Sequence, residues 1–522
     1  MKGTAQRFRT LLDQPQAIQE SVLLEVLSRH ARCEYGRRFD FASITSSFDF
    51  RTRLPIVSAE ELQPDVERMV NGEPQVLLSE RIVTFEPTGG TSAGAKLVPY
   101  TAASLEAYRR ALLPWLDDLF CAHAELATGT MYWSVSPACR DRRHSPAGIP
   151  IGLDSDAEYL GIEVAAELAG RFSVPPVLGL ARDVDTWRHL TVHYLLADEN
   201  LALISIWSPT FLLELLRYAQ ENGSVLAAGI AAGQPEVQIP ADLRAHLPPR
   251  RPDPRRALEV ANRLAGSPPR YEALWPRLRL ISCWDQAAAR VYAQELRQCL
   301  PGVEVQGKGL LATEAAVSIP LTGAPLPVLA VESAFYEFID ADGSSRLAHE
   351  VTEGAEYELL LTNHSGLYRY AIGDRVRVGG FIGRTPMLEF IGRTGVASDL
   401  CGEKITESFA LRVLGPLGLR FAALAPQTHA PRGYILLLDA AEVPMDRAQE
   451  LASHVDSALE ANPQYAYARK LRQLAQLHAV RCAHPLQNWI ETSLTRGQKL
   501  GDIKPSALYS RDDWRGVFSP VL

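Results

Sequence analysis

Residues 86–96 carry the clearest chemical signal in the sequence, Glu86-Pro-Thr-Gly-Gly-Thr-Ser-Ala-Gly-Ala-Lys96. Its glycines have no Cβ, so the backbone can adopt positive φ and turn several N–H donors toward one anion. Hydroxyl groups add further donors, and the lysine adds a positive charge. The stretch therefore predicts a phosphate-binding loop, formed by Thr88, Gly89, Gly90, Thr91, Ser92 and Lys96.

This loop lacks the G-x-x-x-x-G-K-[ST] pattern, because Lys96 lies two residues after Gly94 and is followed by Leu97. A switch GTPase or a P-loop ATPase is therefore disfavoured. A surface turn is the alternative, since Gly, Ser and Thr are also common in turns. The flanks favour the phosphate-binding interpretation: residues 81–85 and 96–101 have strand-like patterns, and a helix is expected from Ala102.

Three further motifs follow the loop. Ala312-Thr-Glu314 pairs a hydroxyl with a carboxylate, which suits Mg²⁺ and a phosphate oxygen, although Thr before Glu is also good helix-capping chemistry. Asp374 follows a glycine, where its carboxylate can accept the hydroxyls of a ribose or form an ordinary turn. Arg393 and Lys404 lie near an expected domain junction.

The element pattern predicts an α/β fold with a large mixed α/β N-terminal domain, residues 1–392, and a small, mobile α+β C-terminal domain, residues 393–522. Residues 1–80 are expected to be helical. Strands at 278–284 and 303–306 flank a helix at 286–300, which predicts a βαβ unit. Open α/β sheets bind ligands at the ends of such strands. The proline- and arginine-rich segment 234–256 is expected to be solvated.

Composition narrows the class of protein. The chain has 522 residues, 22% of them charged, and a formal net charge of -8, which argues against nucleic acid or an anionic membrane as partner. Its most apolar long window, residues 201–216, is too short and too polar to cross a bilayer. Seven scattered cysteines without a metal-binding spacing indicate reduced thiols, so we expect a cytoplasmic protein. We also expect a monomer or weak homodimer.

Taken together, these motifs resemble the Gretchen Hagen three family of acyl acid amido synthetases. That family lies within the adenylate-forming superfamily, which also contains acyl-CoA ligases and luciferases. The likeness covers essentially the whole chain and rests on four motifs: Thr88-Gly-Gly-Thr-Ser-Ala-Gly-Ala-Lys96, Ala312-Thr-Glu314, Tyr368-Arg-Tyr-Ala-Ile-Gly-Asp374, and Gly392-Arg-Thr-Gly-Val396 with Glu403-Lys404.

The resemblance implies the adenylate-forming fold and a two-step reaction, in which ATP·Mg²⁺ activates a carboxylic acid as acyl-AMP and an amine then takes the acyl group. The loop would hold the β- and γ-phosphates, Ala312 and Thr313 would lie near the adenine and α-phosphate, and Glu314 would bind Mg²⁺. Asp374 would hold the ribose, with help from Arg393.

The catalytic lysine and the acyl pocket are less closely specified by the sequence. A lysine should neutralise charge between the α- and β-phosphates. The candidates are Lys404, Lys499 and Lys504, although the family's late Lys-Thr-Pro-Arg-like stretch here lacks its arginine. The acyl pocket is expected around Tyr108, Arg109, Trp133 and Trp207, where plain core packing is the alternative for the aromatic side chains.

Two other functions stay open from the sequence. A thioester-forming ligase such as an acyl-CoA synthetase shares the first half-reaction and differs in the acceptor. A binding protein that has lost turnover is the other, and the intact Thr313, Glu314 and Asp374 argue against it.

Overall fold

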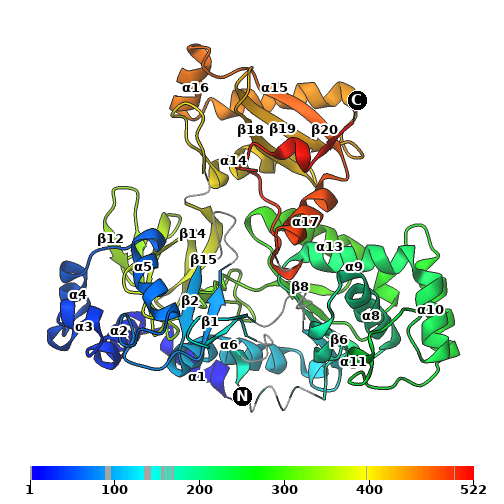
Figure 1. Ribbon diagram of the computed structural model, residues 1–522, viewed down its shortest axis with the longest axis horizontal. Coiled ribbons are helices and arrows are strands. Elements are labelled where there is room, and N and C mark those ends of the chain that lie inside the picture. The colour runs from blue at the N-terminus through cyan, green and yellow to red at the C-terminus, as the bar shows by residue number, and fades with distance from the viewer. Residues whose placement is uncertain are drawn as a thin grey trace.

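The structure is a computed structural model that describes residues 3–88, 96–133, 143–153, 159–161, 164, 166, 168, 170–394, 397–498 and 500–521, with the backbone alone at residue 502. The chain forms two lobes side by side and a smaller part above them, which contains the C-terminus (Figure 1). The predicted mixed α/β fold is confirmed.

The first lobe begins with a helical segment, as predicted. It contains α1 (Thr4–Leu11), α2 (Pro15–His30), α3 (Glu34–Arg38), α4 (Ser47–Arg53) and α5 (Ala59–Val70). A small sheet of order β2-β1-β5-β4 follows, made of β1 (Thr84–Pro87), β2 (Leu97–Tyr100), β4 (Arg143–His144) and β5 (Pro150–Ile151). Helix α6 (Ala102–Ala122) starts where expected, because the Thr101 and Ser104 side chains cap its first turn reciprocally.

A seven-stranded antiparallel sheet completes this lobe, in the order β12-β11-β13-β14-β15-β10-β9. Its strands are β9 (Ser318–Ile319), β10 (Val328–Leu329), β11 (Phe335–Ile339), β12 (Ser345–Leu347), β13 (Glu356–Thr362), β14 (Tyr370–Ile382) and β15 (Thr385–Arg393). The long β14–β15 pair brings Asp374 directly opposite Arg393.

The second lobe contains a parallel sheet of order β3-β6-β7-β8. Its strands are β3 (Thr130–Trp133), β6 (Leu201–Ser205), β7 (Leu280–Cys283) and β8 (Glu304–Gly307), and its helices are α8 (Val184–Ala197), α9 (Pro209–Glu221), α10 (Gly223–Ala232), α11 (Ala241–Arg244), α12 (Pro254–Leu264) and α13 (Arg290–Cys299). Every residue of β6 is buried, as expected for a parallel strand covered on both faces. The predicted βαβ unit is β7-α13-β8.

The third region carries a two-stranded sheet, β16 (Ala397–Ser398) with β17 (Ile405–Thr406), and a sheet of order β18-β19-β20-β21. The latter contains β18 (Ala422–Gln427), β19 (Gly433–Asp439), β20 (His478–Ala483) and β21 (Ser519–Pro520); the helices are α14 (Glu407–Leu414), α15 (Met445–Leu459), α16 (Pro463–Lys470) and α17 (Pro485–Thr495). In Figure 1, α17 lies between this region and the second lobe.

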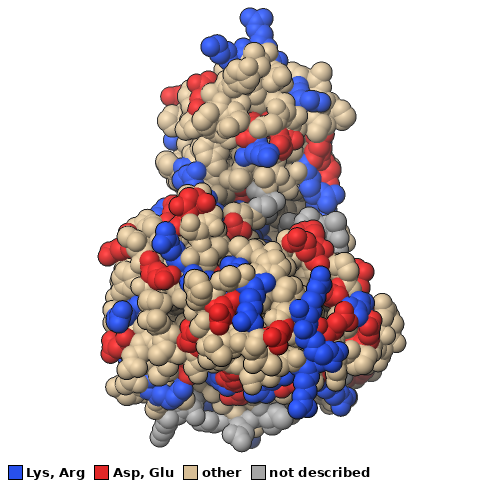
Figure 2. Space-filling view, turned by 90° about the vertical axis from the view of Figure 1, so that its left-hand side faces the viewer, with Lys and Arg blue, Asp and Glu red and all other residues tan. Residues whose placement is uncertain are grey.

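The outer surface carries charged side chains of both signs. Figure 2 shows a narrowing between the smaller upper part and the larger lower part, with acidic and basic side chains interspersed over this face. Among the residues described, no helix is both long and apolar enough to cross a membrane.

Candidate active site

The glycine-rich segment connects two paired strands, as its flanks predicted. Strands β1 and β2 are antiparallel, and beyond their ends the N–H of Thr88 donates to the carbonyl of Lys96 at 2.8 Å. Gly89, Gly90, Thr91 and Ser92 lie outside the described residues. At the base of the loop, Lys96 Nζ lies 2.9 Å from a carboxylate oxygen of Glu60 on α5.

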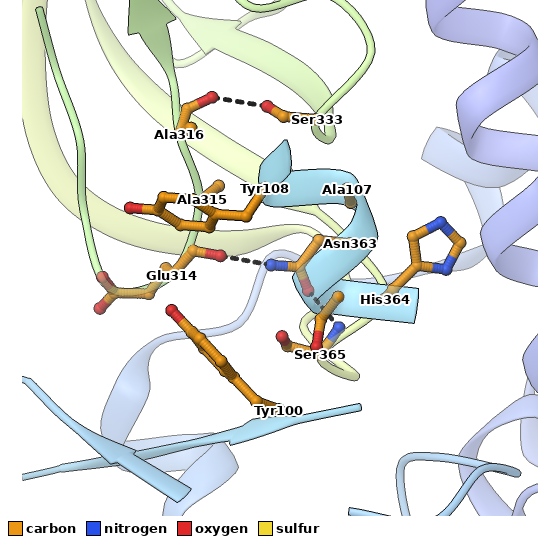
Figure 3. Close-up of a pocket in the computed structure, with 11 residues that line it drawn as sticks. Tyr100, Ala107, Tyr108, Glu314, Ala315, Ala316, Ser333, Asn363, His364 and Ser365 are labelled. Atoms are coloured by element: carbon orange, nitrogen blue, oxygen red, sulfur yellow. Dashed lines mark hydrogen bonds between the residues drawn. The ribbon is translucent and has the colours of Figure 1, made fainter. Parts of the chain in front are cut away.

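The Ala312–Glu314 segment is a tight turn, held by two tyrosines and an asparagine. The Tyr108 hydroxyl donates to the Ala312 carbonyl at 2.7 Å, and the Tyr100 hydroxyl donates to the Thr313 carbonyl at 2.5 Å. The Asn363 amide donates to the Glu314 carbonyl at 2.6 Å. Figure 3 shows Tyr100, Tyr108, Glu314 and Asn363 around a small pocket. The turn is therefore fixed through its carbonyls, which leaves the Thr313 and Glu314 side chains for other partners.

Glu314 lies at the electrostatic centre of the predicted nucleotide site. Burial raises the pKa of its carboxyl, the nearby Asp374 carboxylate raises it further, and the Arg393 guanidinium and the Lys96 ammonium oppose the rise. These interactions require the four side chains to be close enough to affect one another. The structure thus brings together four residues that are separated by up to 297 positions in the sequence.

Asp374 and Arg393 form an ion pair across neighbouring strands. The Arg393 Nε donates to Asp374 Oδ1 at 2.6 Å, and Asp374 is only 3% exposed. The nearby carboxylate raises the pKa of the Arg393 guanidinium. Gly373 has a φ of +77°, and its carbonyl accepts the backbone N–H of Thr394 at 2.6 Å. The glycine therefore lets the end of β15 close against Asp374, so the Gly-Asp pair is part of a strand and not an isolated turn.

The predicted acyl-pocket residues fall into two groups. Tyr108 and Arg109 lie on α6. The ring centroids of Tyr108 and Tyr159 are 4.8 Å apart, and the Arg109 guanidinium lies 3.1 Å from a carboxylate oxygen of Glu106. Trp133 and Trp207 lie at the ends of the parallel strands β3 and β6 and are both half-buried. The structure thus places Tyr108 beside the Ala312–Glu314 turn and the two tryptophans at the edge of the parallel sheet.

Family models match the chain over most of its length. The model described as the GH3 family N-terminal domain matches residues 4–305, and the GH3 family central domain matches residues 327–393. The chain belongs to the GH3 family.

Curated relatives that match the chain include plant proteins named as amido synthetases. The chain is 26% identical over 432 residues to the indole-3-acetic acid-amido synthetase GH3.2 of Arabidopsis thaliana, covering 76% of this chain and 77% of the relative. It is 25% identical over 516 residues to the probable indole-3-acetic acid-amido synthetase GH3.1 of Oryza sativa subsp. japonica, covering 85% and 79%. The family predicted from the sequence is therefore confirmed, and the predicted reaction class agrees with the names of these relatives.

Solved structures support the same fold. The GH3.15 acyl acid amido synthetase superposes with a TM-score of 0.86 at 19% identity and covers 99% of this chain and 96% of its own. A 2-hydroxyisobutyryl-CoA ligase in complex with its acyl-adenylate, 2-HIB-AMP, gives a TM-score of 0.52 at 12% identity, covering 92% and 85%. The adenylate-forming fold expected from the motifs is therefore confirmed.

The candidate lysines of this GH3 protein occupy different surroundings. Lys404 is exposed, has a φ of +45° and follows Glu403, whose buried carboxylate accepts the hydroxyl of Tyr434. Lys504 Nζ lies 3.6 Å from the ring centroid of Trp284, directly after β7. Lys499 is outside the described residues.

Sequence reasoning missed three side chains at this edge of the parallel sheet: Trp115, Trp284 and Lys308. The Lys308 ammonium lies among indole rings and donates to Ser205 Oγ at 2.7 Å. The motif Gln306-Gly-Lys-Gly-Leu310 and the aromatic residues near strand ends were visible in the sequence, but their spacing gives no sign that they meet.

Proposed function

We propose that this GH3-family protein is an ATP-dependent acyl acid amido synthetase. In the first half-reaction a carboxylate oxygen of the acid attacks the α-phosphorus of ATP, the bond from that phosphorus to the α,β-bridging oxygen breaks, and acyl-AMP and pyrophosphate form. In the second, an amine nitrogen attacks the acyl carbon, AMP leaves, the nitrogen loses a proton, and an amide results. The observation that carries the proposal is the convergence of Lys96, Glu314, Asp374 and Arg393.

Different residues around Glu314 would bind different parts of the nucleotide. The loop from Thr88 to Ser92 and Lys96 would hold the β- and γ-phosphates, with Lys96 exchanging its contact with Glu60 for phosphate oxygens. Ala312 and Thr313 would lie along the adenine and the α-phosphate. The turn that carries them is held through its carbonyls by Tyr108 and Tyr100. A rigid turn limits the positional freedom of the reacting phosphorus.

Asp374 would accept the ribose hydroxyls. It is a buried carboxylate at a strand end, and its bond to Arg393 Nε uses one of its two oxygens. A carboxylate accepts several hydrogen bonds at once, so this ion pair orients the group and leaves room for the sugar. Arg393 lies at the end of β15, where it would help to bind the ribose and would stabilise the junction with the C-terminal region.

The donor set around Glu314 fits Mg²⁺. The described residues hold no group of three or more His, Cys, Asp or Glu side chains that could form a complete protein cage. Mg²⁺ commonly binds through one or two carboxylates together with substrate phosphates and water, and Glu314 supplies such a carboxylate. Bound there, the ion would neutralise charge that develops between the α- and β-phosphates. Because burial raises the pKa of Glu314, a cation beside it would also stabilise the ionised form.

We further propose the domain division at residues 392 and 393 and assign the catalytic lysine to Lys504. One apolar core includes no residue beyond Leu388, and another consists of residues from Ile405 onward, which supports a boundary between them. A third core contains residues of the second lobe and residues from Phe421 onward, so the C-terminal region also packs against that lobe. Both side chains are exposed, but Lys504 lies over Trp284, at the edge where the parallel strands end, whereas Lys404 lies in the loop between β16 and β17. A cation already at that edge is well placed to stabilise the leaving pyrophosphate.

The direct test is carboxylate-dependent pyrophosphate release from ATP. Purified protein is supplied with Mg²⁺, ATP and a panel of acids that includes indole-3-acetate and 2,4-DB, the compounds named for the relatives. CoA or a mixture of amino acids is then added, and the product is identified by mass spectrometry. Amide formation supports the proposal. Formation of a thioester without an amide would show that the protein is an acyl-CoA ligase. Absence of pyrophosphate release with every acid would show that it is a binding protein without turnover.

A further inference from the structure

Asn363 connects the antiparallel sheet to the backbone of Glu314. It follows β13 directly and is 4% exposed. Its side-chain Nδ2 donates to the Glu314 carbonyl at 2.6 Å, and its Oδ1 accepts the backbone N–H of Ser365 at 2.9 Å (Figure 3). A peptide N–H can only donate and a carbonyl can only accept, so these two partners fix the orientation of the amide.

The two hydrogen bonds of the Asn363 side chain have different explanations. The bond to Ser365 is an Asx turn, in which a side-chain oxygen accepts the N–H two residues further along the chain. Aspartate or serine could supply that oxygen as well. The bond to Glu314 requires a donor that reaches one bond further, and the amide nitrogen provides it. The local turn therefore accounts for the oxygen of Asn363, and the contact with Glu314 accounts for its nitrogen.

Asn363 holds the residue of the turn that carries the carboxylate. The two preceding carbonyls of the turn accept hydrogen bonds from the tyrosines of β2 and α6. Asn363 donates to the third carbonyl, which belongs to Glu314 itself. The C=O of Glu314 and its Cα lie in one planar peptide unit, so fixing that oxygen restricts rotation about the Cα–C bond. The amide of Asn363 therefore limits the directions that the Glu314 side chain can take.

The same contact ties Glu314 to the sheet that carries its charged neighbours. The backbone N–H of Asn363 donates to the Leu367 carbonyl at 3.0 Å, which closes the connection between β13 and β14. Strand β14 carries Asp374, and β15 beside it carries Arg393. Asn363 therefore joins Glu314 to the sheet in which Asp374 and Arg393 form their ion pair.

Both ends of this hydrogen bond are buried. Glu314 is 8% exposed, so water does not readily replace a donor that its carbonyl has lost. A buried carbonyl left without a donor is costly, which favours the contact between Asn363 and Glu314. The amide is neutral and contacts the backbone of Glu314, so this bond occupies neither carboxylate oxygen.

We propose that Asn363 is a positioning residue for the metal site: its amide fixes the backbone of Glu314 so that the carboxylate faces the Mg²⁺ of Mg²⁺·ATP. The inference rests on the proposed function, because it takes Glu314 as the Mg²⁺ ligand. Asn363 acts through Glu314 and needs no contact with the nucleotide itself. Side chains that orient a metal ligand in this way typically change metal affinity roughly 10- to 100-fold.

The test measures how much Mg²⁺ strengthens nucleotide binding. A non-hydrolysable ATP analogue is titrated by calorimetry with Mg²⁺ and again with EDTA, and the ratio of the two Kd values gives the Mg²⁺-dependent gain. N363A should reduce this gain roughly 10- to 100-fold and leave binding in EDTA unchanged. A variant that is only less stable would lower the number of active sites and leave the ratio unchanged.

Asn462 provides a matched control. At the start of α16 its Oδ1 accepts the backbone N–H groups of Gln464 and Tyr465, and its Nδ2 donates to the Glu403 carbonyl at 2.8 Å. N462A therefore removes the same kinds of hydrogen bond at another glutamate, and it should leave the Mg²⁺-dependent gain unchanged. N363A combined with E314Q should reduce the gain no further than E314Q alone, because both changes act on one ligand.

A milder variant keeps the proposal testable if N363A fails to fold. N363S keeps an oxygen for the turn at Ser365, but its hydroxyl is one bond shorter than the amide and falls short of the Glu314 carbonyl. It should therefore also show a reduced Mg²⁺-dependent gain. Equal weakening with Mg²⁺ and with EDTA in N363A, or a wild-type gain in N363S, would overturn the proposal.

The binding data also separate this proposal from the proposed function. If N363A loses the Mg²⁺-dependent gain but the wild-type protein releases no pyrophosphate with any acid, the positioning role stands and the amido synthetase reaction is refuted. If the wild-type protein releases pyrophosphate and N363A keeps the full gain, the positioning role alone is refuted. A wild-type protein that binds the analogue equally well with Mg²⁺ and with EDTA would overturn both the positioning role and the assignment of Glu314 as the metal ligand.

Discussion

Replacing Asp374 with asparagine should weaken ATP binding through the ribose. Asp374 is buried, and Arg393 Nε contacts one of its oxygens at 2.6 Å. Asparagine keeps the shape and one acceptor oxygen but removes the charge. Charge-assisted hydrogen bonds are about twice as strong as neutral ones.

The size of the effect follows from the two ribose hydroxyls. If each charge-assisted bond contributes about 1.5–3 kcal/mol, losing half of two such bonds costs about 1.5–3 kcal/mol, or a rise in Kd of about 10- to 150-fold. The stability cost should be smaller, about 1 kcal/mol, because the Arg393 side chain is 41% exposed and water screens its pair with Asp374.

Calorimetry with a non-hydrolysable ATP analogue and its 2′,3′-dideoxy form separates these terms. The wild-type protein should bind the dideoxy form more weakly, and D374N should show a clearly smaller difference between the two forms, because about half of the hydrogen-bond energy to the ribose hydroxyls is lost. D446N changes an exposed aspartate on α15 and serves as the control. If D374N still discriminates between the two nucleotides as the wild-type protein does, Asp374 does not hold the ribose and the assignment of the nucleotide site is wrong.

Three further predictions concern charge at buried or edge positions. Burial raises the pKa of the Glu314 carboxyl, so its protonated form contributes stability that is present at low pH and is lost as the pH rises through the folded-state pKa. Titration of Mg²⁺·ATP should therefore show weaker binding as the pH falls toward that pKa, and E314Q should lose this dependence; a flat wild-type profile would contradict it. Arg369 and Glu337 form a bidentate pair, with side chains 8% and 1% exposed, so E337A should cost about 3–5 kcal/mol of unfolding free energy in urea. The double variant E337A/R369M should be more stable than E337A, and the reverse order would refute the buried-charge explanation. K504M should slow acid-dependent pyrophosphate exchange roughly 100- to 1000-fold. The control K470M, which replaces an exposed lysine on α16, should leave the exchange rate unchanged. Normal exchange in K504M would exclude Lys504 as the catalytic lysine.

Much of the fold could be predicted because its signals are local. Strands β1 and β2 were recognisable on either side of a run of glycine, serine and threonine, and Thr101 marks the start of α6. The unit β7-α13-β8 was predicted from two apolar runs around an amphipathic stretch. These features depend on the spacing of residues within about twenty positions, and such spacing is directly visible in a sequence.

The misses concern contacts between distant segments. The segment 234–256 was expected to be solvated, but Arg256, at its end, is 2% exposed and donates to the carbonyls of Leu196 and Leu274 at 2.7 Å each. That expectation was wrong for Arg256, because its partners lie 18 and 60 positions away along the chain. Trp133 and Trp207 were selected as pocket residues, whereas Lys308 between them was not. No local pattern reports that three strands end at the same edge.

The segment from Gly307 to Glu314 links the two halves of the candidate site. At one end Lys308 follows β8 directly at the carboxyl edge of the parallel sheet, and at the other end Glu314 lies close to Asp374 and Arg393 of the antiparallel sheet. Six residues span at most about 20 Å when fully extended, and the turn at Ala312 shortens that reach. The chain itself therefore keeps the carboxyl edge of the parallel sheet close to the buried Glu314 carboxylate. Adenylation requires two anions, the acid and the phosphate, to meet at a fixed separation, and a short connection between the two sheets limits how far apart their binding sites can lie.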